Sequence, residues 1–201
     1  LLFGILNGQQ PFLIDGLLAP VMLVARVASP AGPQEFTDQF YVHLPDDPAL
    51  RERDIVVVNA PGADLIGMLP VMQAVRGKVV PRRMRMLGPS LSPVTLTRED
   101  ERTLRLVPDD GYLAWSYDHL LRSPDRPFTL GQKIDVAGMT AEVTALTDDG
   151  RPAAARFTFD VPLEDPSLVW MQWRDGRFLP FTPPAIGETV KLPRAMPLLN
   201  P

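Results

Sequence analysis

DIVVVN, at residues 54–59, is the stretch that decides the fold, because a continuous β-branched run of this length is typical of a strand buried on both faces of a sheet. Residues 60–62 (APG) break the strand, and Leu65–Val75 (LIGMLPVMQAV) then predicts a helix that ends at Gly77. Arg82–Leu87 (RRMRML) predicts a second strand. These segments predict one β-α-β unit with parallel strands and a right-handed crossover.

Downstream of this unit, short apolar runs separated by turn residues predict antiparallel hairpins. The Asp175-Gly176 pair is the strongest turn signal, since both residues tolerate the positive φ angles of a type I′ turn. Side-chain alternation places Trp170 and Trp173 on opposite faces, so one is expected in the core and the other at a surface. The expected strands are Pro93–Thr97, Thr103–Val107, Lys133–Val136, Met139–Thr147, Ala153–Asp160, Leu168–Trp173, Arg177–Phe181 and Glu188–Leu192.

The predicted fold class is α+β, with an N-terminal membrane-associated helix, one β-α-β unit, and antiparallel β hairpins that form a small barrel or sandwich. The 23 prolines among 201 residues favour short strands and abrupt turns, because proline lacks a backbone donor and fixes φ. The expected divisions are residues 1–28 (end of a transmembrane region), 29–53 (connector), 54–126 (α+β subdomain), 127–193 (antiparallel β subdomain) and 194–201 (tail).

Two apolar segments at the start of the chain, Leu1–Leu6 and Phe12–Ala28, predict membrane association. A helix over the second segment would rise about 26 Å, close to the hydrocarbon core of about 30 Å. Asp15 lies near the expected N-terminal end, where a carboxylate is favourable, and Arg26 can reach the interface at the other end. We expect the tail of one membrane helix and then a last helix over residues 11–28, both belonging to a longer polypeptide. A buried helix of a soluble core is the alternative.

Composition excludes several classes of function. A net charge of −4 supplies no cationic footprint for nucleic acid, so nucleic acid is not expected as a partner. The absence of cysteine excludes disulfides, thiolate metal sites and cysteine nucleophiles. His43 and His119 each lack a second ligand at metal spacing, and the Asp-Asp pairs at 46–47, 109–110 and 148–149 read as turn formers. No catalytic residue, metal or cofactor is therefore predicted.

The polar residues best placed for a ligand are Asn59 and Asp64, because binding sites gather at the carboxyl ends of parallel strands. His119 is a third candidate for a shared site. Residues 62–67 (GADLIG) have the glycine spacing of a phosphate-binding loop, but Met68 and Leu69 replace its Lys and Ser/Thr. The alternative is that Asn59 and Asp64 only satisfy backbone groups at a turn and a helix cap.

A basic stretch runs from the end of the expected helix into the second strand. Five cations occur within ten residues without an acid, and each could contribute about 1 kcal/mol to binding an anionic lipid surface. The sequence predicts an exposed cationic surface near the membrane; a solvated strand edge paired with Glu99, Asp100 or Glu101 is the alternative. The five residues are Arg76, Lys78, Arg82, Arg83 and Arg85.

A family resemblance covers nearly the whole chain. The stretch from DIVVVNAP to the end of FTPPAIGETVKLP, including VPLEDPSLVW, resembles the C-terminal part of a group of uncharacterised multi-spanning bacterial membrane proteins. Their last apolar segment is similar to FLIDGLLAPVMLVARVAS at residues 12–29. The resemblance implies the membrane topology described above, and it implies no activity and no catalytic residues.

The expected function follows from these observations. The favoured hypothesis is a non-catalytic extramembrane C-terminal domain of a polytopic bacterial membrane protein, with a binding, sensing or scaffolding role on the extracytoplasmic (periplasmic) side. The expected partners are the membrane, the upstream transmembrane helices of the same polypeptide, and anionic lipid headgroups. The alternative is an accessory domain of a membrane-embedded enzyme or transporter, with a site shared with upstream helices.

Overall fold

The computed structural model describes residues 44–114, 125–175 and 177–194. The apolar segments Leu1–Leu6 and Phe12–Ala28, and with them the expected membrane helix, lie outside these residues. No helix within the described ranges has the length and apolar character needed to cross a membrane.

The described part of the chain is mostly β, so the predicted α+β class is wrong. It contains one α-helix, α3 (Ala63–Val75), and one 3-10 helix, η3 (Pro48–Glu52), beside ten strands. Frequent prolines and turn residues keep the other elements short. Short segments favour strands over helices, because proline interrupts a helix. The strands are β1 (Asp54–Val57), β2 (Arg83–Met86), β3 (Val94–Arg98), β4 (Thr103–Pro108), β5 (Lys133–Val136), β6 (Met139–Leu146), β7 (Pro152–Phe159), β8 (Leu168–Arg174), β9 (Arg177–Pro180) and β10 (Thr189–Leu192).

The predicted β-α-β unit is present. Strands β1 and β2 pair in parallel from Asp54↔Arg83 to Val57↔Met86, and α3 connects them. The helix begins after Gly62, which makes no side-chain cap, so Asp64 is its second residue and not its cap. Strand β1 is buried along its whole length because it has a second parallel neighbour, β8, on its other side.

The eight predicted antiparallel strands are also present, each within two residues of its expected ends. Asp175 adopts the positive φ of 53° that the predicted hairpin turn requires. The strands form two sheets, one in the order β2-β1-β8-β9 and one in the order β10-β3-β4-β7-β6-β5. Each sheet combines strands from both sides of residue 127, since β1 pairs with β8 and β4 with β7.

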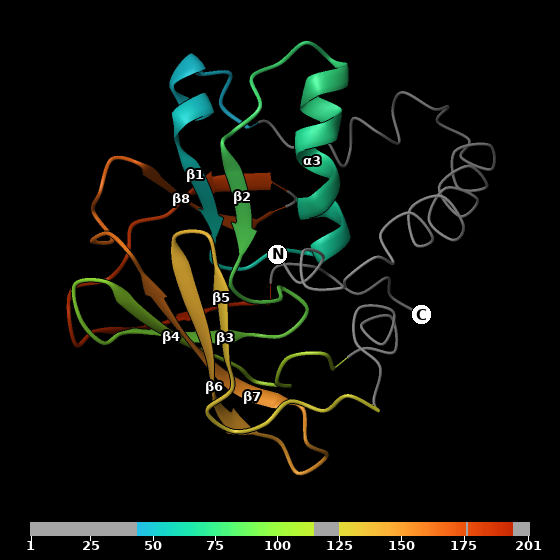
Figure 1. Cartoon of the computed structure of the whole chain (residues 1–201), viewed down its shortest axis with the longest axis vertical. Helices are drawn as coiled ribbons and strands as arrows, with labels where there is room; N and C mark the ends of the chain where they lie inside the picture. The colour runs from blue at the N-terminus through green and yellow to red at the C-terminus, as the bar shows by residue number, and fades with distance from the viewer. Residues whose placement is uncertain (1–43, 115–124, 176, 195–201) are drawn as a thin grey trace.

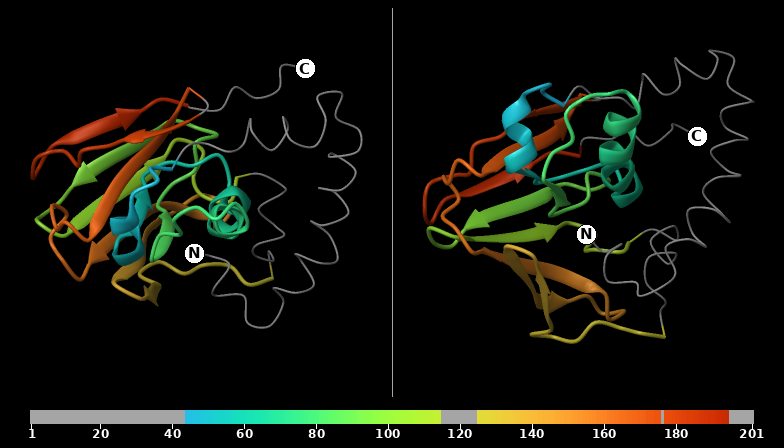
Figure 2. Two further views of the ribbon diagram at one scale, coloured as in Figure 1. Left: turned by 90° about the horizontal axis from the view of Figure 1, so that it is seen from above. Right: turned by 45° about the horizontal axis from the view of Figure 1, so that its top comes forward.

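The elements stack in three layers, with α3 and η3 on one side, the four-stranded sheet in the middle, and the six-stranded sheet on the other side (Figures 1 and 2). Side-chain alternation along β1 explains the stacking. Val56 faces the six-stranded sheet and packs in a core with Leu96 and Leu106, whereas Ile55 faces α3 and packs in a second core with Leu69.

The two tryptophans of β8 lie on opposite faces, as alternation predicts. Trp170 belongs to the core between the sheets, and Trp173 belongs to the core beneath α3. Both are buried, so the expectation that one lies at a surface is wrong. The reason is that the middle sheet is covered on both faces, which a single hairpin sequence cannot reveal.

Candidate functional site

Asn59 lies two residues after the end of β1 and is buried. Its Nδ2 donates to the carbonyl of Trp173 at 3.1 Å, and the Trp173 amide donates to Asn59 Oδ1 at 3.0 Å. The side-chain amide thus continues the pairing between β1 and β8 beyond the last ladder residues. The sequence left open the alternative that Asn59 only satisfies backbone groups, and these hydrogen bonds agree with that alternative. Asp64 lies in the first turn of α3, and His119 lies outside the described residues.

Replacing Asn59 with alanine is expected to lower the free energy of unfolding by about 1–3 kcal/mol, because the buried Trp173 carbonyl loses its partner. Urea denaturation of the 201-residue chain measures the effect. Gln132→Ala, which removes an exposed amide contact to the Thr129 backbone, is the matched control and should stay within about 0.5 kcal/mol. A loss as small as the control's would show that the Asn59 amide is not needed by the fold.

The five cations of the basic stretch do not form one surface. Arg76 is the C-cap of α3 and is exposed, and Lys78 pairs with Asp46 at 2.7 Å. The other three, Arg82, Arg83 and Arg85, converge on one carboxylate, that of Asp54. Because Arg85 is only 2 % exposed, the prediction of an exposed surface is wrong for this residue.

Asp54 is the residue that sequence reasoning missed at this cluster. Its carboxylate is 4 % exposed and accepts from Arg82 Nε at 2.8 Å and Arg83 Nε at 2.9 Å on one oxygen, and from Arg85 Nη2 at 3.0 Å on the other. Arg85 Nη2 also donates to the carbonyl of Ala137 in the β5–β6 turn. The parallel register Asp54↔Arg83 brings these residues together. The only feature of the sequence that could have indicated the role of Asp54 was therefore the predicted parallel pairing of the two strands.

The cluster perturbs the ionisation of its members. Burial raises the pKa of Asp54, but hydrogen bonds from Arg83 and Arg82 and the charge of Arg85 outweigh it, so the pKa lies below its usual value. Burial lowers the pKa of Arg85, and the charges of Arg83 and Arg82 lower it further against the opposing effect of Asp54. Asp54 is therefore ionised at neutral pH, and three cations surround one charge.

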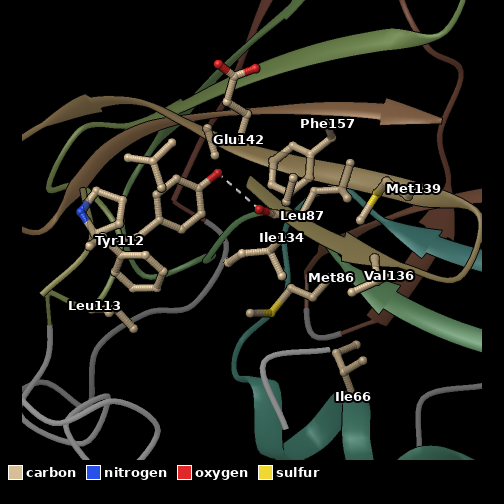
Figure 3. A pocket seen from close by; sticks show the side chains of 15 residues that line it. Ile66, Met86, Leu87, Tyr112, Leu113, Ile134, Val136, Met139, Glu142 and Phe157 are labelled. Atoms are coloured by element: carbon tan, nitrogen blue, oxygen red, sulfur yellow. Dashed lines mark hydrogen bonds between the residues drawn. The ribbon is translucent and has the colours of Figure 1, made fainter. Parts of the chain in front are cut away.

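A second candidate site is an apolar cavity of about 120 Å³ between β2, the start of α3 and the inner face of β5, β6 and β7 (Figure 3). Ile134 and Val136 of β5 and Ala141 of β6, which line the cavity, are only partly buried. Alternate residues of β6 face the cavity, which sequence periodicity could have indicated. Labelled wall residues include Ile66, Met86, Ile134, Met139 and Phe157.

The cavity wall carries little polar chemistry. The Tyr112 hydroxyl donates to the carbonyl of Leu87 at 3.1 Å, and desolvation raises the pKa of Tyr112 well above its usual value, so this group stays neutral. Figure 3 shows the Glu142 carboxylate directed away from the cavity centre, and Arg156 donates to it at 3.4 Å. An apolar cavity of about 150 Å³ is known to hold benzene. This cavity therefore suits one ring or one aliphatic side chain.

No protein-family model, curated protein or solved structure matches this chain significantly. Within the described part of the chain, no group of three or more acidic or histidine side chains is arranged to hold a metal ion.

Proposed function

We propose that this chain carries a non-catalytic binding domain that lies against the extracytoplasmic surface of a bacterial membrane and belongs to the extramembrane part of a polytopic membrane protein. The outer face of α3 is the observation that carries the proposal. Val71 is 53 % exposed and Val75 is 78 % exposed, on the side of the helix away from the sheet.

The composition of α3 supports docking at an apolar surface. Ile66 and Leu69 point into the core, and the outer side chains Val71 and Val75 are apolar as well. A helix that is apolar on all sides is normally covered on all sides. Arg76, exposed at the end of α3, adds a positive charge next to the outer face. An apolar face bordered by a cation suits the interface of a bilayer that contains anionic lipid.

The entry point of the chain supports the same orientation. Leu44, the first described residue, is buried in the core beneath α3. The apolar segment Phe12–Ala28 is therefore joined to the α3 layer by residues 29–43, which span at most about 50 Å when fully extended. A bilayer that holds this segment is within reach of the outer face of α3.

The interior polar groups support a binding role without catalysis. The side-chain amide of Asn59 is hydrogen-bonded to the backbone of Trp173, and the carboxylate of Asp54 forms salt bridges with three arginines. These groups stabilise the fold, and the docking face itself consists of valines, which have no acid-base chemistry.

A single fluorescent label tests the proposal, because the chain has no cysteine of its own. Val75→Cys in the 201-residue chain is labelled with a polarity-sensitive dye and measured with phosphatidylcholine vesicles, with and without phosphatidylglycerol. We expect a blue shift of the emission on vesicle binding, larger with phosphatidylglycerol and reduced by salt.

Ile186→Cys is the matched control, since Ile186 is 60 % exposed but precedes β10 at the six-stranded sheet. Its dye emission should be the same with vesicles as in buffer. Unchanged emission at position 75 with both vesicle compositions, while the chain sediments with the vesicles, would contradict the proposed docking face.

A further inference from the structure

We infer that Arg82 and Arg83 form a binding site for a phosphate group, held in position from behind by the buried carboxylate of Asp54. The inference does not rest on the proposed docking face, because the arginines lie at the edge between the two sheets, beside the β5–β6 turn.

The geometry of the two arginines supports the site. Each donates to Asp54 Oδ1 through Nε, at 2.8 Å for Arg82 and 2.9 Å for Arg83. A guanidinium bound through Nε keeps its Nη groups for a second partner, and two parallel donors match the oxygens of a phosphate. The side chains are 39 % and 36 % exposed, so a ligand can reach them from solvent.

The buried carboxylate makes this arrangement rigid before any ligand arrives. Asp54 lies in the central strand β1, and its position is fixed by the ladders to β2 and β8. Arginines that are already ordered lose less side-chain entropy on binding than free surface arginines do. Asp54 therefore acts as a positioning residue, and its own oxygens are not exposed to the anion.

The charge balance leaves the cluster short of negative charge. Arg82, Arg83 and Arg85 surround the single carboxylate of Asp54. The pKa of Asp165 is lowered mainly by hydrogen bonds from Ser167 and to a small extent by the charge of Arg82. The charges of Arg82 and Arg83 disfavour the charged form of the buried Arg85. A bound dianion would relieve this repulsion and balance the excess charge.

Two further features lie beside the site formed by Arg82 and Arg83. The Nε of Arg85 is buried and has no hydrogen-bond partner within the described part of the chain. Gly138, with a φ of +86°, brings the β5–β6 turn close to the arginines, and a Cβ at this position would lie 3.5 Å from Arg85 Nη2 and 3.8 Å from Arg83 Nη2. The absence of a side chain keeps the space beside the guanidinium groups open.

Inorganic phosphate is the probe that tests the site. The melting temperature of the 201-residue chain is measured against phosphate concentration, with chloride at equal ionic strength as the baseline. We expect a saturable increase with phosphate, as ligand binding to the folded state requires. In Arg82→Gln/Arg83→Gln the apparent affinity should fall at least ten-fold, and phosphorus NMR line broadening should fall with it.

Two comparisons separate a binding site from general effects of charge. Arg102→Gln/Arg174→Gln removes two half-exposed arginines that pair with surface acids, and it should retain the phosphate affinity of the parent. Arg82→Lys/Arg83→Lys keeps both charges but loses the paired donors, so its affinity should fall at least five-fold. This variant also provides the test if the glutamine variant does not fold. Equal phosphate affinity in the parent and the lysine variant, or no saturable effect in the parent, would overturn the inference.

The source of the phosphate group is resolved by a second arm with phosphatidylglycerol vesicles. Vesicle binding that inorganic phosphate competes away, and that the glutamine variant lacks, would identify a lipid headgroup as the ligand. Saturable binding of inorganic phosphate without competition at vesicles would identify a soluble phosphate compound. Both outcomes support the site, and the label at position 75 reports separately on the docking face of α3.

Discussion

Asp54→Ala is expected to lower the free energy of unfolding by about 3–5 kcal/mol, because the substitution leaves the charge of Arg85 buried without its carboxylate. Arg85 is 2 % exposed and has no other acid among the contacts of the cluster. Chemical denaturation at neutral pH measures the loss. Asp149→Ala, which removes an exposed carboxylate paired with Arg151, is the control and should cost less than about 1 kcal/mol.

A double substitution separates the buried charge from the packing of the site. Asp54→Leu/Arg85→Met removes both charged groups, and replacing a buried ion pair by apolar residues of similar size is often neutral. We expect the double variant to be at least about 2 kcal/mol more stable than Asp54→Ala. If the double variant is as unstable as Asp54→Ala, then lost packing and not the unpaired charge accounts for the effect.

The effect of Asp54 also depends on pH. Its pKa in the folded state lies below the usual value of 3.8, so the ionised carboxylate favours folding. Its contribution to stability is fully present above the unfolded pKa and is lost as the pH falls through the lowered folded pKa. The difference in free energy of unfolding between the parent and Asp54→Ala should therefore change by no more than about 0.5 kcal/mol between pH 6 and pH 7, and it should shrink below about pH 4.

Trp170→Ala is expected to lower the free energy of unfolding by about 3–5 kcal/mol, the range for deleting a large aromatic side chain from a core. Trp170 packs between the two sheets, with its ring centroid 5.3 Å from that of Phe159 in an edge-on arrangement. Its Nε1 donates to the carbonyl of Leu163 at 2.7 Å. The substitution thus creates a cavity and also removes a buried hydrogen bond.

Trp170→Phe is the matched control, because phenylalanine keeps an aromatic ring at the contact with Phe159 but cannot donate to Leu163. We expect it to cost about 1–2 kcal/mol, clearly less than Trp170→Ala. Equal losses for the two variants would show that the hydrogen bond, and not the filled volume between the sheets, dominates the contribution of Trp170.

Local sequence patterns determined the elements of this fold. The β-branched run at residues 54–59, the helix near 65–75 and the eight antiparallel strands were predicted close to their observed ends. These signals are local, because side-chain alternation and turn-forming residues act over a few positions. The Asp175-Gly176 turn is an example, since the positive φ at Asp175 follows from the dipeptide itself.

Only the tertiary structure decided how the strands combine and which polar groups are buried. Strand β8 pairs with β1 more than a hundred residues earlier, so Asn59 is bound by Trp173, and the sheet becomes covered on both faces. The parallel register of β1 and β2 places Asp54 beside three arginines, so a stretch that reads as a basic surface forms an ion cluster in which Asp54 and Arg85 are buried. Pairing between remote strands depends on which faces become buried together, and neither the spacing nor the composition of a single segment contains that information.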